Sequence, residues 1–230
     1  MRNRWLVAVV LWAAGAASVA AANFWETKSY TDWSQKEVDA MLTDSPWARK
    51  ISVVVPVPPR GGGDDAGGRG GGGDDGGGRG GRVGGAFPVA APQLKLVITW
   101  RSALPMRQAL LRSESGANST TPGQQPLVDR NEPFYVVTLA GVPARYARAA
   151  AATAGAASFL RRGNNKMPIA LAEGGVSQDG ATLTIIFEFP RTDPITLEDK
   201  EVEFVTKLGE VEIKKKFNLK ELVFHGQLDL

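Results

Sequence analysis

The stretch that decides the fold is VEFVTKLGEVEIKKKF, residues 202–217. Apolar and polar side chains alternate on both sides of Gly209-Glu210, and such alternation is typical of strands with one buried face. A two-residue connection that begins with glycine fits a type II′ turn. The stretch therefore predicts an antiparallel hairpin in which residues 202–208 pair with residues 211–217.

The turn also sets the register of this hairpin. It places opposite charges across from each other at two positions, Glu203 with Lys216 and Lys207 with Glu212. Such cross-strand pairs favour the register. The same register puts Lys215 on the apolar face beside Phe204, so we expect Lys215 to lie at the rim of the core or next to a bulge. Phe204 and Phe217 are expected to point into the core.

Similar patterns flank the hairpin. In residues 93–101 and 182–189 apolar side chains occupy every second position and share one face. Shorter extended segments are expected at residues 51–55, 134–139, 159–162, 167–172, 222–224 and 227–230. We therefore predict a mainly β fold, either an antiparallel sheet or a β-sandwich, with a few short helices. An α+β arrangement is the alternative.

Short helices are predicted at four places. Ser34 and Glu37 fit a capping box, in which the hydroxyl and the carboxylate satisfy each other's backbone N–H groups. Pro46 suits the first position of a second helix, because proline has no N–H to leave unsatisfied there. Pro105 introduces a third helix, and an alanine-rich run at residues 142–157 predicts the fourth.

Residues 1–22 predict a secretory signal peptide. Arg2 and Arg4 precede an uncharged apolar run from Trp5 to Ala17, and small residues follow up to a cleavage site before Asn23. An uncleaved anchor is the alternative. We expect a periplasmic or extracellular protein with no stable membrane span after cleavage.

Residues 60–85 form a glycine-rich insert of low complexity. It contains the tandem decapeptides GGGDDAGGRG and GGGDDGGGRG, residues 61–70 and 71–80. Glycine has no side chain to bury and loses the most backbone entropy on folding, so a disordered loop is predicted. Weak ion or surface binding is the functional alternative. Residues 23–59, an aromatic helical segment with the first strand, and residues 86–230 are expected to form one β-rich domain around this insert.

Composition excludes several classes of site. The chain has no cysteine and one histidine, His225, so disulfides, thiolate chemistry and two-histidine zinc motifs are absent. Removal of Arg2 and Arg4 lowers the net charge from +3 to +1. This balance makes nucleic acid an unlikely partner. No cofactor and no metal site is expected.

The segment before the insert contains three tryptophans, Trp25, Trp33 and Trp47. They are candidates for a surface that stacks on a carbohydrate or a partner. Tryptophans around a short helix more often anchor that helix to a sheet, and we favour this interpretation.

No catalytic constellation stands out. His225 has no serine nucleophile in a G-x-S-x-G setting to act with. Paired carboxylates for hydrolysis are a spatial feature, and Glu188, Asp193 and Glu198 are candidates only in that sense.

Five stretches resemble exported proteins of unknown function from acidobacteria: WETKSY (25–30), DWSQKEV (32–38), LTDSPWA (42–48), WRSALP (100–105) and FPRTDPI (189–195). Several of these proteins also carry a glycine-rich insert at this place, and some are loosely grouped with GWxTD-domain proteins. The G-W-x-T-D string is absent from this chain. The resemblance implies export and no catalytic residues.

The sequence therefore predicts an exported binding or structural module of the cell envelope, whose partner is an envelope protein or a glycan. The alternative is a carboxylate-dependent hydrolase that acts on envelope or polysaccharide material.

Overall fold

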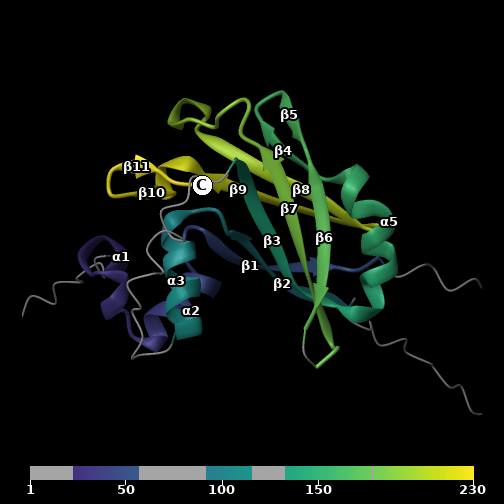
Figure 1. The fold of residues 1–230 in the computed structure, drawn as a ribbon. Helices are drawn as coiled ribbons and strands as arrows, with labels where there is room; N and C mark the ends of the chain where they lie inside the picture. Colours follow the sequence, from purple (N-terminus) through teal and green to yellow (C-terminus); the bar gives the residue numbers. More distant parts are fainter. Residues whose placement is uncertain (1–22, 57–91, 116–132, 178) are drawn as a thin grey trace, which may run out of the picture.

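A computed structural model describes residues 23–56, 92–115, 133–177 and 179–230 (Figure 1). The predicted signal peptide, residues 1–22, and the glycine-rich insert, residues 60–85, lie outside the described residues. The sheets and helices named below belong to these four ranges of the chain.

The larger sheet has five antiparallel strands in the order β1-β2-β3-β7-β6. Its strands are β1 (Ala48–Val54), β2 (Gln93–Trp100), β3 (Phe134–Pro143), β7 (Thr182–Pro190) and β6 (Leu171–Val176). Every second side chain of β7 is buried, Leu183, Ile185, Phe187 and Phe189. This alternation gives the sheet an inner, apolar face and an outer face.

The smaller sheet has four antiparallel strands in the order β5-β4-β8-β9. Its strands are β5 (Asn165–Pro168), β4 (Phe159–Arg162), β8 (Glu201–Leu208) and β9 (Val211–Asn218). A two-stranded ribbon, β10 (Val223–Phe224) with β11 (Gln227–Leu228), follows near the C-terminus.

The hairpin register predicted from the sequence is confirmed. Glu203 lies opposite Lys216, and Lys207 lies opposite Glu212. The ion pairs nevertheless form with other neighbours, because Lys216 binds Glu201 at 2.6 Å and Glu203 binds Arg161 on β4. The pairing continues without a register shift through the half-buried Lys215, so this residue lies at the rim of the core and not beside a bulge.

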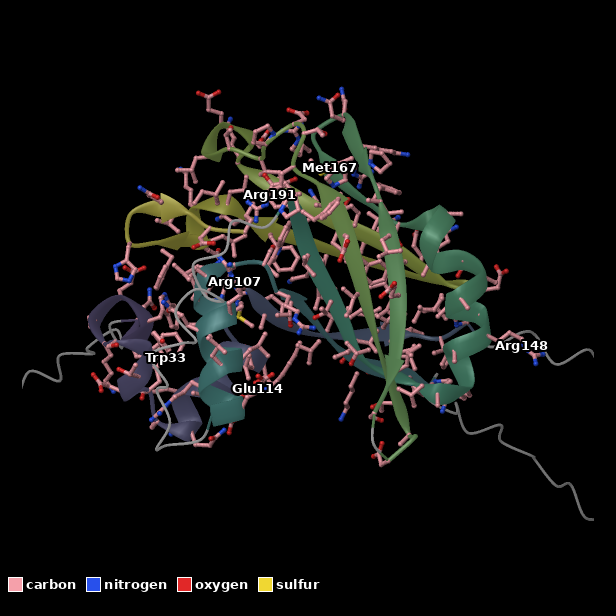
Figure 2. All side chains as sticks on the ribbon, viewed as in Figure 1. Trp33, Arg107, Glu114, Arg148, Met167 and Arg191 are labelled. Atoms are coloured by element: carbon pink, nitrogen blue, oxygen red, sulfur yellow. The ribbon has the colours of Figure 1, made fainter. Side chains whose placement is uncertain are left out.

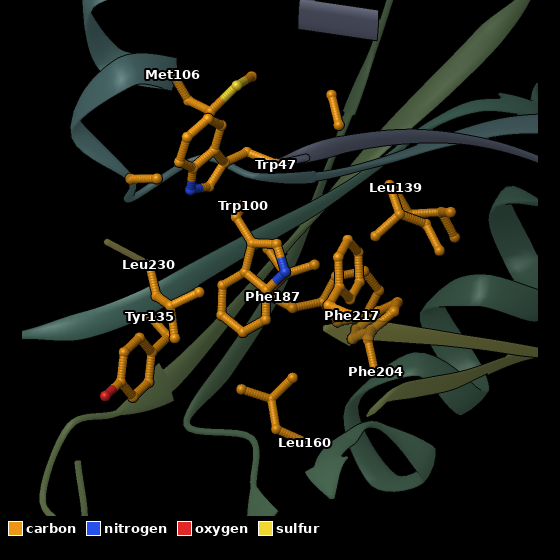
Figure 3. Close-up of a cluster of buried hydrophobic side chains, with 14 of the residues drawn as sticks. Trp47, Trp100, Met106, Tyr135, Leu139, Leu160, Phe187, Phe204, Phe217 and Leu230 are labelled. Atoms are coloured by element: carbon orange, nitrogen blue, oxygen red, sulfur yellow. The ribbon is translucent and has the colours of Figure 1, made fainter. Parts of the chain in front are cut away.

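The inner faces of the two sheets pack against each other (Figure 3). The ring centroids of Phe187 and Phe204 lie 5.0 Å apart, and those of Trp100 and Phe217 lie 5.7 Å apart, both edge to face. Such pairs join β7 to β8 and β2 to β9 across the core. The protein is therefore mainly antiparallel β with a few short helices, as predicted.

The helices flank the sheets (Figure 1). They are α1 (Phe24–Thr27), α2 (Gln35–Thr43), α3 (Leu104–Ser115) and α5 (Ala147–Ala157), with short 3-10 turns η1 (Tyr30–Asp32), η3 (Ala144–Tyr146), η4 (Leu197–Asp199) and η5 (Leu219–Glu221). The capping box of Ser34 and Glu37 is confirmed at the start of α2. Helices α2 and α3 pack together, and α5 packs against β8 and β6.

Three expectations about element bounds are wrong. No helix begins at Pro46, because Ser45 and Ala48 close a tight bridge and β1 starts at once. The alanine-rich helix starts at Ala147 and not at residue 142, because β3 continues to Pro143. Residues 167–172 do not form one strand; they divide between β5 and β6, which belong to different sheets.

Candidate functional site

A groove lies between α3 and the outer face of the five-stranded sheet. Its floor comes from β3 and β7, where Val136 lies opposite Glu188 in the register and Ile186 is the next outward residue of β7. Their neighbours Val137 and Phe187 are fully buried in the core, so these three side chains project from the other face. We call this cavity of about 430 Å³ the α3 groove.

One stripe of α3 forms the wall of the groove. Arg107, Leu110, Leu111 and Glu114 are spaced at i, i+3, i+4 and i+7, and all four line the cavity. Met106 and Ala109 lie on the opposite stripe and are fully buried. Helix α3 therefore has one apolar side in the core and one mixed side toward the groove, with Arg107 and Glu114 about two turns apart (Figure 2).

Backbone contacts fix the end of the groove at the turn after β2. The N–H of Val136 donates to Ser102 Oγ at 3.0 Å, and the N–H of Arg101 donates to the carbonyl of Val136 at 2.7 Å. Ser102 is buried and Arg101 is exposed, and both line the cavity. The turn that carries Arg101 is thus held to β3 by two hydrogen bonds.

The C-terminal tail holds the N-terminus of α3 in place. The Leu104 N–H donates to Asp229 Oδ1 at 3.0 Å, so a carboxylate sits at the positive end of the helix. Burial raises the pKa of Asp229, although the Leu104 N–H and the charges of Arg107 and Arg191 act in the opposite direction. The contact positions the first turn of the groove wall.

The groove carries both signs of charge around an apolar centre. Two arginines and two glutamates surround two leucines, a valine and an isoleucine: Arg101, Arg107, Glu114, Glu188, Leu110, Leu111, Val136 and Ile186. This lining suits a ligand that has apolar groups and charges of both signs. It is poorly matched to a polyanion, which requires an excess of positive charge.

The three tryptophans of the predicted surface lie in or against the core. Trp33 and Trp47 are 1% and 0% exposed, and Trp25 is half-buried. The ring of Trp25 lies edge-on to that of Trp47 at 6.0 Å, and Phe24 lies edge-on to Trp33 at 5.3 Å. The indoles of Trp33 and Trp47 therefore offer no face to a ligand, and both side chains anchor their segment to the core.

The acidic candidates from the sequence occupy separate environments. Glu188 lines the α3 groove, whereas Asp193 forms an ion pair with Arg162 on β4, and Glu198 is exposed in η4. His225 is also exposed, and its backbone N–H donates to the Glu26 carboxylate at 3.3 Å. Glu188 is therefore the one of these candidates that lies in the groove.

Sequence reasoning missed Arg107, Leu111 and Glu114. Their helical spacing was visible, but a stripe of mixed charge usually faces solvent, and nothing in the sequence places it opposite Val136. In the described ranges no cluster of histidine, aspartate or glutamate could hold a metal ion. None of the helices seen there has the length and hydropathy needed to cross a bilayer. Comparisons with protein-family models, curated proteins and solved structures find no match.

Proposed function

We propose that this protein is an exported, non-catalytic binding module of the cell envelope that holds a polypeptide segment of an envelope protein in the α3 groove. Residues 1–22 support export, because they have the charge, apolar run and small residues of a signal peptide. The lining of the groove supports a polypeptide ligand.

The observation that supports this proposal most strongly is the combination of charges and apolar side chains in the groove. Arg101 and Glu188 offer partners to an acidic and a basic side chain, and Leu111 offers a contact to an apolar one. A polypeptide segment supplies all three kinds of group on one short chain. Binding sites commonly combine an apolar lining with a few polar groups that fix orientation.

A glycan fits the described surface less well than a polypeptide does. Glycan sites commonly use an aromatic ring as a flat apolar platform. The large hydrophobic side chains that are exposed within the described residues are aliphatic, Val54, Leu171, Val176 and Leu197. This favours the envelope protein over the glycan as the partner class.

Selection of peptides tests the proposal. A random peptide-display library is panned against the exported protein, and we expect enrichment of peptides that combine apolar, acidic and basic residues. Binding of these peptides should fall at least about ten-fold in Leu111→Glu, because the substitution puts a charge against the apolar centre of the groove. It should also fall in Arg101→Glu.

Leu197→Glu is the matched control. Leu197 is an exposed leucine in η4, away from the groove, so the same substitution should leave peptide binding unchanged. Equal loss of binding in Leu111→Glu and Leu197→Glu, or no enriched peptide at all, would contradict the proposal.

A carboxylate-dependent hydrolase is the second candidate function. The observation that favours it is that Glu114 and Glu188 line the same groove. Incubation of the protein with purified peptidoglycan or other envelope polysaccharide tests this candidate. Release of soluble fragments that disappears in both Glu188→Gln and Glu114→Gln would establish hydrolysis and overturn the binding-only proposal.

A further inference from the structure

Strand β6 leaves an edge of the larger sheet open. In the described part of the chain it pairs with β7 alone. Its sequence, LAEGGV, contains neither the lysine nor the proline that natural proteins place on edge strands to prevent pairing with other chains. The contrast is with β9, the last strand of the smaller sheet, which carries three lysines in succession, Lys214 to Lys216.

The ladder shows which backbone groups of β6 point outward. The N–H of Ser177 donates to the carbonyl of Thr182, and the two residues continue the register in which Val176 lies opposite Leu183. Hydrogen-bonded and non-hydrogen-bonded pairs alternate along antiparallel strands. The N–H and C=O groups of Ala172, Gly174 and Val176 therefore point away from β7, toward the open edge.

The same three residues line a hollow between β6 and α5. This hollow has a volume of about 390 Å³, and α5 contributes small residues to it: Ala147, Ala150, Ala151, Ala154 and Gly155. Val176, which lines the hollow, is 62% exposed, and Leu171, on the opposite face of β6, is 43% exposed. Helix α5 lies beside β6 (Figure 1). It adds exposed small side chains at Ala151, Ala152 and Ala156.

We propose that this edge binds a second copy of the chain. Strand β6 would pair antiparallel with β6 of the other copy about a two-fold axis at Gly174, so that the two five-stranded sheets become continuous. Ala172 would then lie opposite Val176 of the other copy, and Gly174 opposite its own counterpart. In this register every outward backbone group meets another outward group, which completes the ladder across the edge.

Charge excludes one of the other symmetric registers. About the Gly174 axis, Glu173 lies opposite Gly175 of the other copy, whose added Cβ would meet no atom within 4 Å. About an axis at Glu173, two like charges would face each other directly, which is destabilising. The stretch of α5 from Ala151 to Ala156 carries no charge, so α5 of the two copies can approach without repulsion.

The edge is self-complementary, and this favours a second copy of the chain as the strand that pairs with it. Its outward groups, its small residues and the spacing of Glu173 from Gly175 all match under one two-fold rotation. The inference uses a different surface from the α3 groove, and it does not rest on the proposed function.

Two substitutions at Gly175 test the proposal. In the paired edge Gly175→Lys puts a positive charge opposite Glu173 of the other copy, whereas Gly175→Glu puts a negative one there. Both remove the same glycine, so each controls for the backbone effect of the other. Sedimentation equilibrium of the exported protein should show a dimer whose Kd is lower for Gly175→Lys than for Gly175→Glu by roughly two- to thirty-fold, because the two-fold axis repeats the pair.

The difference in Kd between these two variants should become smaller with added salt, because the charge pair is exposed. A third variant, Val176→Lys, places a charge on the edge and should shift the protein to monomer, whereas Leu197→Lys should not. A protein that stays monomeric up to about 100 µM, or a dimer with the same Kd in both Gly175 variants, would overturn the proposal.

Discussion

The indole N–H of Trp47 donates to the backbone carbonyl of Asp229 at 2.7 Å, across 182 positions of the sequence. The Asp229 carboxylate in turn accepts the N–H of Leu104 at the start of α3. One residue of the C-terminal tail therefore joins the turn before β1 to the helix that forms the wall of the groove. The position of that wall depends on contacts between segments that are distant in the sequence.

Asp229 gives a prediction about pH. Burial raises its pKa above the usual value of 3.8, so the folded state holds this proton more tightly than the unfolded state does. The stability linked to this group is present at low pH and is lost as the pH rises through the raised pKa. Asp229→Asn keeps an oxygen for the Leu104 N–H but cannot ionise.

We therefore expect the stability of Asp229→Asn, relative to that of the wild-type protein, to be greater at pH 7 than at pH 3. Urea unfolding of both proteins at the two pH values measures the difference in free energy of unfolding. A difference that is unchanged, or more favourable at pH 3, contradicts the burial of the carboxylate.

Glu37 should make the stability of the fold depend on pH in the opposite direction. Hydrogen bonds from Lys28 and Ser34 lower its pKa from 4.5 to about 2, so the carboxylate stabilises the fold above pH 4.5 and loses this effect as the pH falls toward 2. Glu37→Gln should cost about 1 kcal/mol at pH 7, a typical effect for a weakened helix cap. Thermal unfolding should show the two proteins converging near pH 2. If Glu37→Gln is still less stable than the wild-type protein near pH 2, the loss of stability comes from packing and not from the charge of Glu37.

Two neighbouring residues of β9 test the hairpin register. Phe217 is 3% exposed and touches Trp100, so Phe217→Ala should cost roughly 3–5 kcal/mol. Lys216 is exposed and binds Glu201 at the surface, so Lys216→Ala should leave the free energy of unfolding nearly unchanged. Denaturant unfolding of both variants measures the two losses of stability. Equal costs would mean that the buried face has been assigned wrongly.

The hairpin could be predicted from the sequence because all its signals are local. Glycine at position 209 has a φ of 63°, the left-handed conformation that the turn requires, and the alternation on each side fixes which residues face the core. No distant contact is needed to choose this register. The same holds for the capping box of Ser34 and Glu37, which spans three positions.

The α3 groove could not be predicted in this way. Glu188 lies on the outward face of a strand and Glu114 on the mixed face of a helix, and both patterns are typical of residues in solvent. They line one cavity because α3, which packs against α2, lies across the groove from β3 and β7. The start of α3 is fixed by Asp229, 125 positions away from Leu104. Neither periodicity nor composition encodes such a distance.

Export gives a prediction that does not depend on the fold. Arg2, Arg4 and the apolar run after them predict cleavage before Asn23. N-terminal sequencing of the protein recovered outside the cytoplasm should begin at or near Asn23. Recovery of a chain that still begins with Met1 would favour the uncleaved anchor.

The most direct test of the account is a methyl NMR titration of the protein with a peptide selected from the display library. Methyl signals of Leu111, Val136 and Ile186 should shift together with one Kd, because all three line the groove. Those of Val54 and Leu197, which are exposed elsewhere, should stay in place. Shifts confined to the methyls outside the groove, with those of Leu111 and Ile186 unmoved, would contradict the claim that the α3 groove is the binding site.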